Sequence, residues 1–207
     1  MTCDISYLPK VSLESLMRHV APVVPAVPHD YGMELIRQAY IEFCRRTRLV
    51  QAQFTYDYQK GVTDYEIVPP DGYEVFFIEE INSPSWKAMD RWDIYNSKSK
   101  FEVIDNAGIR LNSVPSVDVE EGLKIRAVLL PNNTCSYIYS SIDTPYGKGI
   151  AAKAVADLVG MPDKPWHQPG SVPKYEREFG RAVASGKALA SSGRKAGPIE
   201  FRRVRVV

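Results

Sequence analysis

The stretch LIRQAYIEFCRRTRLVQAQFTYDYQ, residues 35–59, changes from one hydrophobic period to another within a few positions. Its first half repeats apolar side chains every three or four residues, which is the spacing of one helix face. These residues are Ile36, Ala39, Tyr40, Phe43 and Cys44. In the second half Phe54, Tyr56 and Tyr58 alternate with polar residues, as in a half-buried strand. The stretch predicts a helix, beginning near Pro28 or Asp30, that leads directly into a sheet.

Strand-like segments continue to about residue 141, separated by Pro, Gly and Asn. They are TDYEIVPP (63–70), YEVFFIEEI (73–81), EGLKIRAVLLP (121–131) and CSYIYSSI (135–142). FEVIDNAGIRL, residues 101–111, predicts a hairpin that turns around Asp105–Gly108. Six or seven short strands with such punctuation predict an antiparallel β-sandwich or a small barrel.

Helical patterns return after the strands. Thr144 is a suitable N-cap for a helix with Pro145 at its first position, which Gly160 and Pro162 would end. Ser171 and Pro173 then open a last helix whose inward residues are Tyr175, Phe179, Val183 and Leu189.

The order helix, sheet, helix predicts an α+β fold. Neither helical zone could bury its apolar stripe alone, so we expect residues 1–49 and 142–190 to form one discontinuous helical bundle. The β domain, residues 50–141, is then an insertion, and residues 191–207 form an extended C-terminal arm. Alternatively, each apolar helix face covers a neighbouring subunit.

Composition excludes several classes of protein. The 207 residues include 26 Lys and Arg against 25 Asp and Glu, so no global field attracts nucleic acid or an acidic membrane. Cys3, Cys44 and Cys135 are too far apart for a zinc site or disulfide scaffold and are typical of free thiols in a reducing cytoplasm. No segment has the pattern of a signal peptide or the roughly 18 apolar residues of a membrane span.

No group of residues predicts catalysis, a metal site or a cofactor. His19, His29 and His167 lie in different elements, and no phosphate-binding or nucleophile motif occurs. Glu79 and Glu80 are neighbours in a predicted strand, so their side chains should diverge and form no dyad. We therefore expect a protein that is not an enzyme, although an enzyme of unrecognised type remains an alternative.

The aromatic residues of the β zone favour sheet packing over nucleic-acid binding. They could stack on bases, but phosphate-binding surfaces are basic. In the aromatic-rich stretch of this zone, residues 54–80, seven acidic residues surround a single cation, Lys60: Asp57, Asp64, Glu66, Asp71, Glu74, Glu79 and Glu80. An acidic surface suits a channel through which DNA slides. The alternative is a β-sandwich module that binds a peptide or nucleic acid without catalysis.

Two cationic segments are candidate partner-binding sites. Arg45, Arg46 and Arg48 crowd the C-terminal end of the first long helix, where they either complement the helix dipole or contact a partner. The C-terminal RKAGPIEFRRVRVV, residues 194–207, is apolar, cationic and β-prone.

Such an arm can add as a strand to the edge of a partner's sheet. The residues that would make this contact are Ile199, Phe201, Arg202, Arg203, Val204 and Arg205. Ordering the arm costs about 1–2 kcal/mol per residue, so we expect it to be disordered until docked on an acidic partner. The alternative is that it pairs back onto the β domain of its own chain.

The order of these motifs resembles the head-to-tail adaptor (connector) proteins of bacteriophages, in particular the tail tubular protein A group of short-tailed phages. There, a helix of the form AxxEFC.RT leads into strands closed by Y.L.PPDG, as do AYIEFCRRT (39–47) and YEIVPPDG (65–72) here. GKGIAAKAVADLVGMPDKPW (147–166) and YEREFGRAVASGKA (175–188) are similar to their helical hairpin. Residues 28–190 share the resemblance, and the N-terminal segment departs from it.

The resemblance implies a structural protein of the virion, made in the cytoplasm of the host bacterium. Such adaptors form a homo-oligomeric ring, commonly of twelve subunits, between the portal ring and the tail nozzle or tube. They extend the channel used in DNA ejection without binding DNA specifically. No catalytic residues are implied, and the portal is the expected partner of the C-terminal arm. Arg45, Arg46 and Arg48 are candidate contacts with the portal or with a neighbouring subunit.

Overall fold

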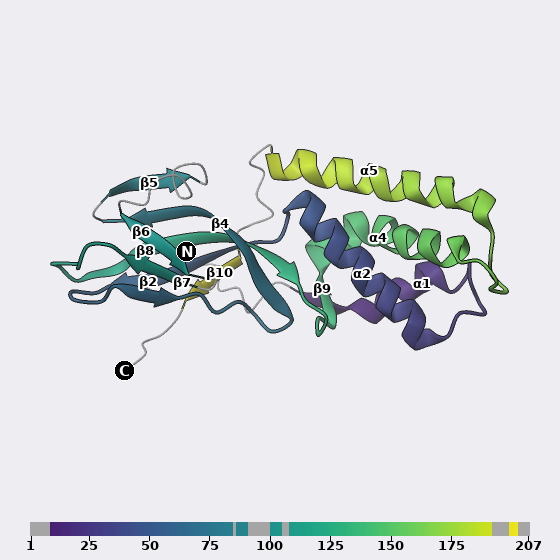
Figure 1. Ribbon diagram of the computed structural model, residues 1–207, viewed down its shortest axis with the longest axis horizontal. Coiled ribbons are helices and arrows are strands. Elements are labelled where there is room, and N and C mark those ends of the chain that lie inside the picture. The colour runs from purple at the N-terminus through teal and green to yellow at the C-terminus, as the bar shows by residue number, and fades with distance from the viewer. Residues whose placement is uncertain (1–8, 85, 91–99, 105–107, 192–198, 203–207) are drawn as a thin grey trace. The chain divides into compact units, whose positions relative to one another are not determined.

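The computed structural model describes residues 9–84, 86–90, 100–104, 108–191 and 199–202, which form two compact units (Figure 1). The helical unit lies within Leu8–Leu49 and Pro131–Ala196. The β unit comprises Val50–Leu130 together with the C-terminal strand. The protein is therefore a mixed α+β fold.

Three helices dominate the helical unit: α2 (His29–Thr47), α4 (Ser140–Gly160) and α5 (Val172–Ser191). A short α1 (Met17–Val20) follows the 3-10 turn η2 (Leu13–Leu16), and a second 3-10 turn, η3 (Pro169–Ser171), precedes α5. Strands β1 (Lys10–Ser12) and β9 (Tyr137–Tyr139) pair antiparallel. α4 is the central helix, because α1, α2 and α5 all pack against it (Figure 1).

The core of this unit consists of the apolar stripes of its helices. The stripe predicted on α2 is buried along its whole length, and Phe179 and Val183 of α5 are buried as well. Tyr175 and Leu189, also expected to face inward, are only half-buried. Burying each large side chain contributes about 1.5–3 kcal/mol, so these stripes decide how the helices pack.

The start of α4 differs from the sequence prediction. The helix begins at Ser140, four residues before Thr144, and Pro145 lies inside it. Pro145 has no N–H to donate to the Ser141 carbonyl, which normally weakens a helix. The first turn is nevertheless held by tertiary contacts, because Asp143 is buried and accepts two hydrogen bonds from Arg18. The helix ends at Gly160, as predicted.

The β unit contains a five-stranded sheet in the order β10-β2-β8-β4-β5. Its strands are β2 (Gln51–Tyr58), β4 (Tyr73–Ser83), β5 (Trp86–Asp90), β8 (Val119–Pro131) and β10 (Ile199–Arg202). β2 pairs antiparallel with β8, with Phe54 opposite Ile125, whereas β10 pairs parallel with β2.

A three-stranded sheet completes this unit in the order β3-β7-β6. Its strands are β3 (Asp64–Glu66), β6 (Phe101–Ile104) and β7 (Gly108–Leu111). β6 and β7 form the antiparallel hairpin that the sequence predicts. The described strands make separate sheets and no closed barrel, so the barrel alternative is wrong.

Strand β8 is irregular at Glu120–Glu121. These residues lie within the strand, at a bulge where Tyr56 pairs with Leu123 and Tyr58 with Val119. Glu121 has φ 52°, and its N–H donates to Asp57 Oδ1 at 3.0 Å. An extra residue of left-handed conformation is a usual way to bend a strand without ending it.

Candidate interaction surfaces

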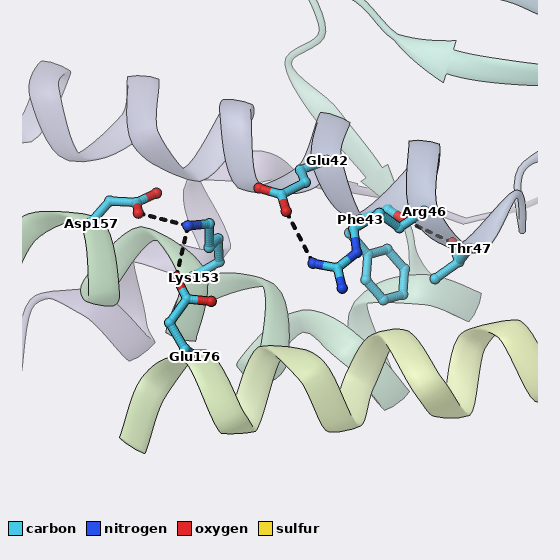
Figure 2. A network of polar contacts seen from close by, with 7 residues as sticks. All are labelled: Glu42, Phe43, Arg46, Thr47, Lys153, Asp157 and Glu176. Carbon is cyan, nitrogen blue, oxygen red and sulfur yellow. Dashed lines mark hydrogen bonds and ion pairs between the residues drawn. The ribbon is translucent and has the colours of Figure 1, made fainter. Parts of the chain in front are cut away.

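The C-terminal end of α2 carries the three arginines that the sequence singled out. Arg45 and Arg48 are exposed. Arg46 is also exposed, but its Nη1 lies 3.1 Å from Glu42 Oε1 (Figure 2). Its guanidinium lies 5.3 Å from the ring centroid of Phe179 on α5. Of the three, Arg46 therefore has the clearest structural role, which is to hold α2 against α5.

Arg48 ends the helix in a left-handed conformation, with φ 56° and ψ 31°. Its N–H donates to the Cys44 carbonyl at 2.8 Å, and β2 begins three residues later at Gln51. Glycine is the usual residue at such a cap. A positive charge at this end of the helix is favoured by the helix dipole.

Helix α5 adds cations that the sequence reasoning missed. Gly186 packs so closely on the end of α2 that a Cβ on it would lie 2.7 Å from Thr47 Cγ2, and the next residue, Lys187, is exposed. Lys174, Arg177 and Arg181 are exposed as well. These three cations are spaced by three and four residues, so they share the helix face opposite the buried Phe179. That spacing could have predicted a cationic face on α5 from the sequence.

A three-residue network joins α4 to α5. Lys153 Nζ lies 2.7 Å from Asp157 Oδ1 on its own helix and 2.9 Å from Glu176 Oε1 on α5 (Figure 2). Burial alone would lower the pKa of Lys153, but its hydrogen bonds to both carboxylates outweigh burial and raise that pKa. The lysine therefore stays charged and bridges the two helices, a structural rather than a catalytic arrangement.

A second polar contact joins α1 to α4. Arg18 Nη2 donates to both carboxylate oxygens of the buried Asp143, at 3.2 and 3.1 Å, and Arg18 Nε donates to His19 Nε2 at 3.1 Å. Partial burial and the neighbouring Arg18 cation lower the pKa of His19. His19 is therefore neutral at pH 7 and accepts this hydrogen bond.

Glu79 and Glu80 do not diverge as predicted. Both approach Arg126 of β8: Arg126 Nε lies 3.5 Å from Glu79 Oε2, and its Nη2 forms an ion pair with Glu80. β4 does not alternate strictly here, because Phe77 and Ile78 are both buried whereas Glu79 and Glu80 are both half-exposed. One arginine thus offsets part of the charge of two adjacent carboxylates, as expected of an ion-pair cluster within a sheet.

The C-terminal arm is described only over Ile199–Arg202, which form β10. This strand lies at the edge of the five-stranded sheet, and its register pairs Ile199 with Ala52 and Phe201 with Phe54. No described strand pairs with the outer side of β10. These four residues therefore pair back onto their own β unit, while Arg203, Val204 and Arg205 lie outside the described residues.

Within the part of the chain that the structure describes, no three His, Cys, Asp or Glu side chains are placed to hold a metal ion. Over the same residues, no helix is long and apolar enough to cross a membrane. No protein-family model matches the chain, and no curated protein matches it.

Proposed function

We propose that this protein is a structural component of a bacteriophage virion, a head-to-tail adaptor that joins the portal ring to the tail nozzle or tube. The observation that carries the proposal is strand β10, a C-terminal segment at the edge of a sheet. Such an edge presents unpaired backbone groups to which a partner strand can add. The motif order of residues 28–190, which resembles phage adaptors, supports the same role.

In this proposal the copies form a ring, of twelve in the virion, at the head–tail junction. The two sheets of the β unit pack as a sandwich toward the tail, and DNA passes through the ring without specific binding during ejection. The arm residues Ile199, Phe201, Arg202, Arg203, Val204 and Arg205 contact the portal. Arg45, Arg46 and Arg48 contact the portal or a neighbouring copy.

Deletion of Pro198–Val207 tests the docking role of the arm. The truncated chain should lose capture by the immobilised portal ring, because β10 and the cations that follow it are gone. The matched control is Lys164→Ala, which removes an exposed cation from the loop before α5 and should leave capture unchanged. Undiminished capture of the truncated chain would refute docking by the arm.

A further inference from the structure

Strand β10 pairs within the β unit, although in the sequence it comes after the helical unit. It pairs with β2 of the β unit, whereas the element that precedes it is α5 of the helical unit. We propose that β10 of one copy pairs with β2 of a second copy, so that strand exchange links the copies head to tail. This inference rests on the proposed ring and names the contact that closes it.

The local contacts of β10 with β2 are the same whichever copy supplies the strand. A short terminal element that can be exchanged in this way is a low-cost route to an oligomer. Residues 192–198 separate Ser191, the end of α5, from Ile199, and a fully extended chain of that length reaches at most about 28 Å. An exchanged β10 must therefore come from a copy whose α5 ends within this distance of the accepting sheet.

Charge favours a second copy of this chain as the partner. Residues 50–130 contain eight Lys and Arg against fourteen Asp and Glu, whereas residues 8–49 and 131–196 together contain fifteen against nine. Exchange of β10 ties the basic helical unit of one copy to the acidic β unit of the next. Such opposite potentials favour head-to-tail association over pairing of like units.

Head-to-tail exchange also predicts the kind of assembly. Each copy donates β10 to one neighbour and accepts β10 at β2 from the other, so the contact is heterologous, and it forms a ring when the rotation between neighbouring copies closes. Among the described strands only β2 pairs with β10, so the exchange uses one side of β10 in either copy. Exchange is therefore compatible with docking of the arm on the portal.

Cysteine pairs at the observed register test the exchange. Glu200 lies directly opposite Gln53, and neighbouring strands bring paired Cα atoms within the range that a disulfide spans. Chains that carry only Gln53→Cys or only Glu200→Cys, both with Cys3→Ser, are mixed and oxidised. Cys44 and Cys135 are buried and should not contribute. Gln53→Cys mixed with Ser185→Cys, an exposed position on α5, measures random collision.

A strand tethered to its own sheet by a short linker competes at an effective concentration in the millimolar range, so exchange should compete near 1 mM protein. We expect the mixture to form a disulfide-linked heterodimer at about 1 mM, at least tenfold above the collision control, and little at about 10 µM. A double variant, with Gln53→Cys and Glu200→Cys in the same chain, should give covalent trimers and larger species at about 1 mM. If the mixture forms no more heterodimer than the collision control, strand exchange is refuted. This holds even if the double variant forms its disulfide within one chain. If the double variant forms covalent dimers but no larger species, the head-to-tail arrangement is refuted.

Portal capture by the uncrosslinked chain separates this inference from the proposed function. Exchange without capture refutes the adaptor role alone. Capture without exchange refutes the strand exchange alone.

Discussion

Gly149→Ala should loosen the contact between α4 and α5. A Cβ added at Gly149 would lie 2.4 Å from Ala182 Cβ, whereas carbon atoms pack at about 3.5–4.0 Å. The helices would have to separate by more than about 1 Å at this point. Such overpacking costs about 1–3 kcal/mol, from which the better helix propensity of alanine recovers about 1 kcal/mol. We expect a net loss of about 1 kcal/mol in the free energy of unfolding.

Gly180→Ala is the matched control, because it makes the same chemical change in α5 where nothing lies within 4 Å of the added Cβ. It should stabilise the protein by up to about 1 kcal/mol through helix propensity alone. The two variants should therefore differ by about 2 kcal/mol. In a chain of this size that corresponds to about 4–8 °C in midpoint temperature.

Urea unfolding followed by far-UV circular dichroism measures the difference, since the helices dominate that signal. The midpoints should move in opposite directions at an unchanged slope. Adding Ala182→Gly to Gly149→Ala removes the clash, so the double variant should be more stable than the sum of the single changes by about 1–2 kcal/mol. If Gly149→Ala and Gly180→Ala shift the midpoint equally, or the double variant is additive, the proposed packing of α4 on α5 is wrong.

Two further predictions concern Lys153 and the cysteines of the helical unit. Lys153→Met should cost about 1 kcal/mol, because Asp157 and Glu176 lose a shared cation while remaining partly solvated. The folded pKa of Lys153 is raised, so its contribution is fully present below the unfolded value of about 10.4 and is lost as the pH rises through the folded value. Urea midpoints of both proteins from pH 6 to 11 should run parallel up to about pH 10 and then converge, and a difference that grows with pH would contradict this. Cys44 and Cys135 are buried, and burial raises the pKa of the Cys44 thiol. A Cys3→Ser chain should therefore react with a thiol reagent only after unfolding. Rapid labelling of the native chain would contradict the burial of these two cysteines.

The elements that the sequence predicted best are those whose apolar pattern is uninterrupted. The stripe of α2 is read from consecutive residues, and each of its predicted members is buried. The β6–β7 hairpin is similarly local, because its turn residues and both strands lie within about ten residues. Local physics therefore suffices for such elements.

The errors arose where distant contacts override local signals. Pro145 indicated a helix start, but the Arg18–Asp143 contact extends α4 back to Ser140. Glu79 and Glu80 were expected to point apart, but Arg126 of the neighbouring strand attracts both. Which residue of another element faces a given side chain is a property of the packed structure and is not encoded in local periodicity.

The candidate surfaces were predictable only in part. Arg45, Arg46 and Arg48 stand out as a run, whereas only the close packing of Gly186 on Thr47 shows that the neighbouring Lys187 belongs to a part of α5 that contacts the end of α2. The β propensity of Ile199–Arg202 was evident, but the sequence left open whether a partner or its own β unit would pair with it. A strand's composition indicates that it will pair without specifying the edge that it joins.

Electron microscopy of the purified chain mixed with the portal ring of its phage tests the central claim most directly. The account predicts that copies of the chain form a ring, of twelve, stacked coaxially on the portal with an open central channel. A portal that stays bare would contradict it, and a salt-sensitive shift with DNA or RNA oligomers in the absence of such rings would favour a nucleic-acid-binding module instead.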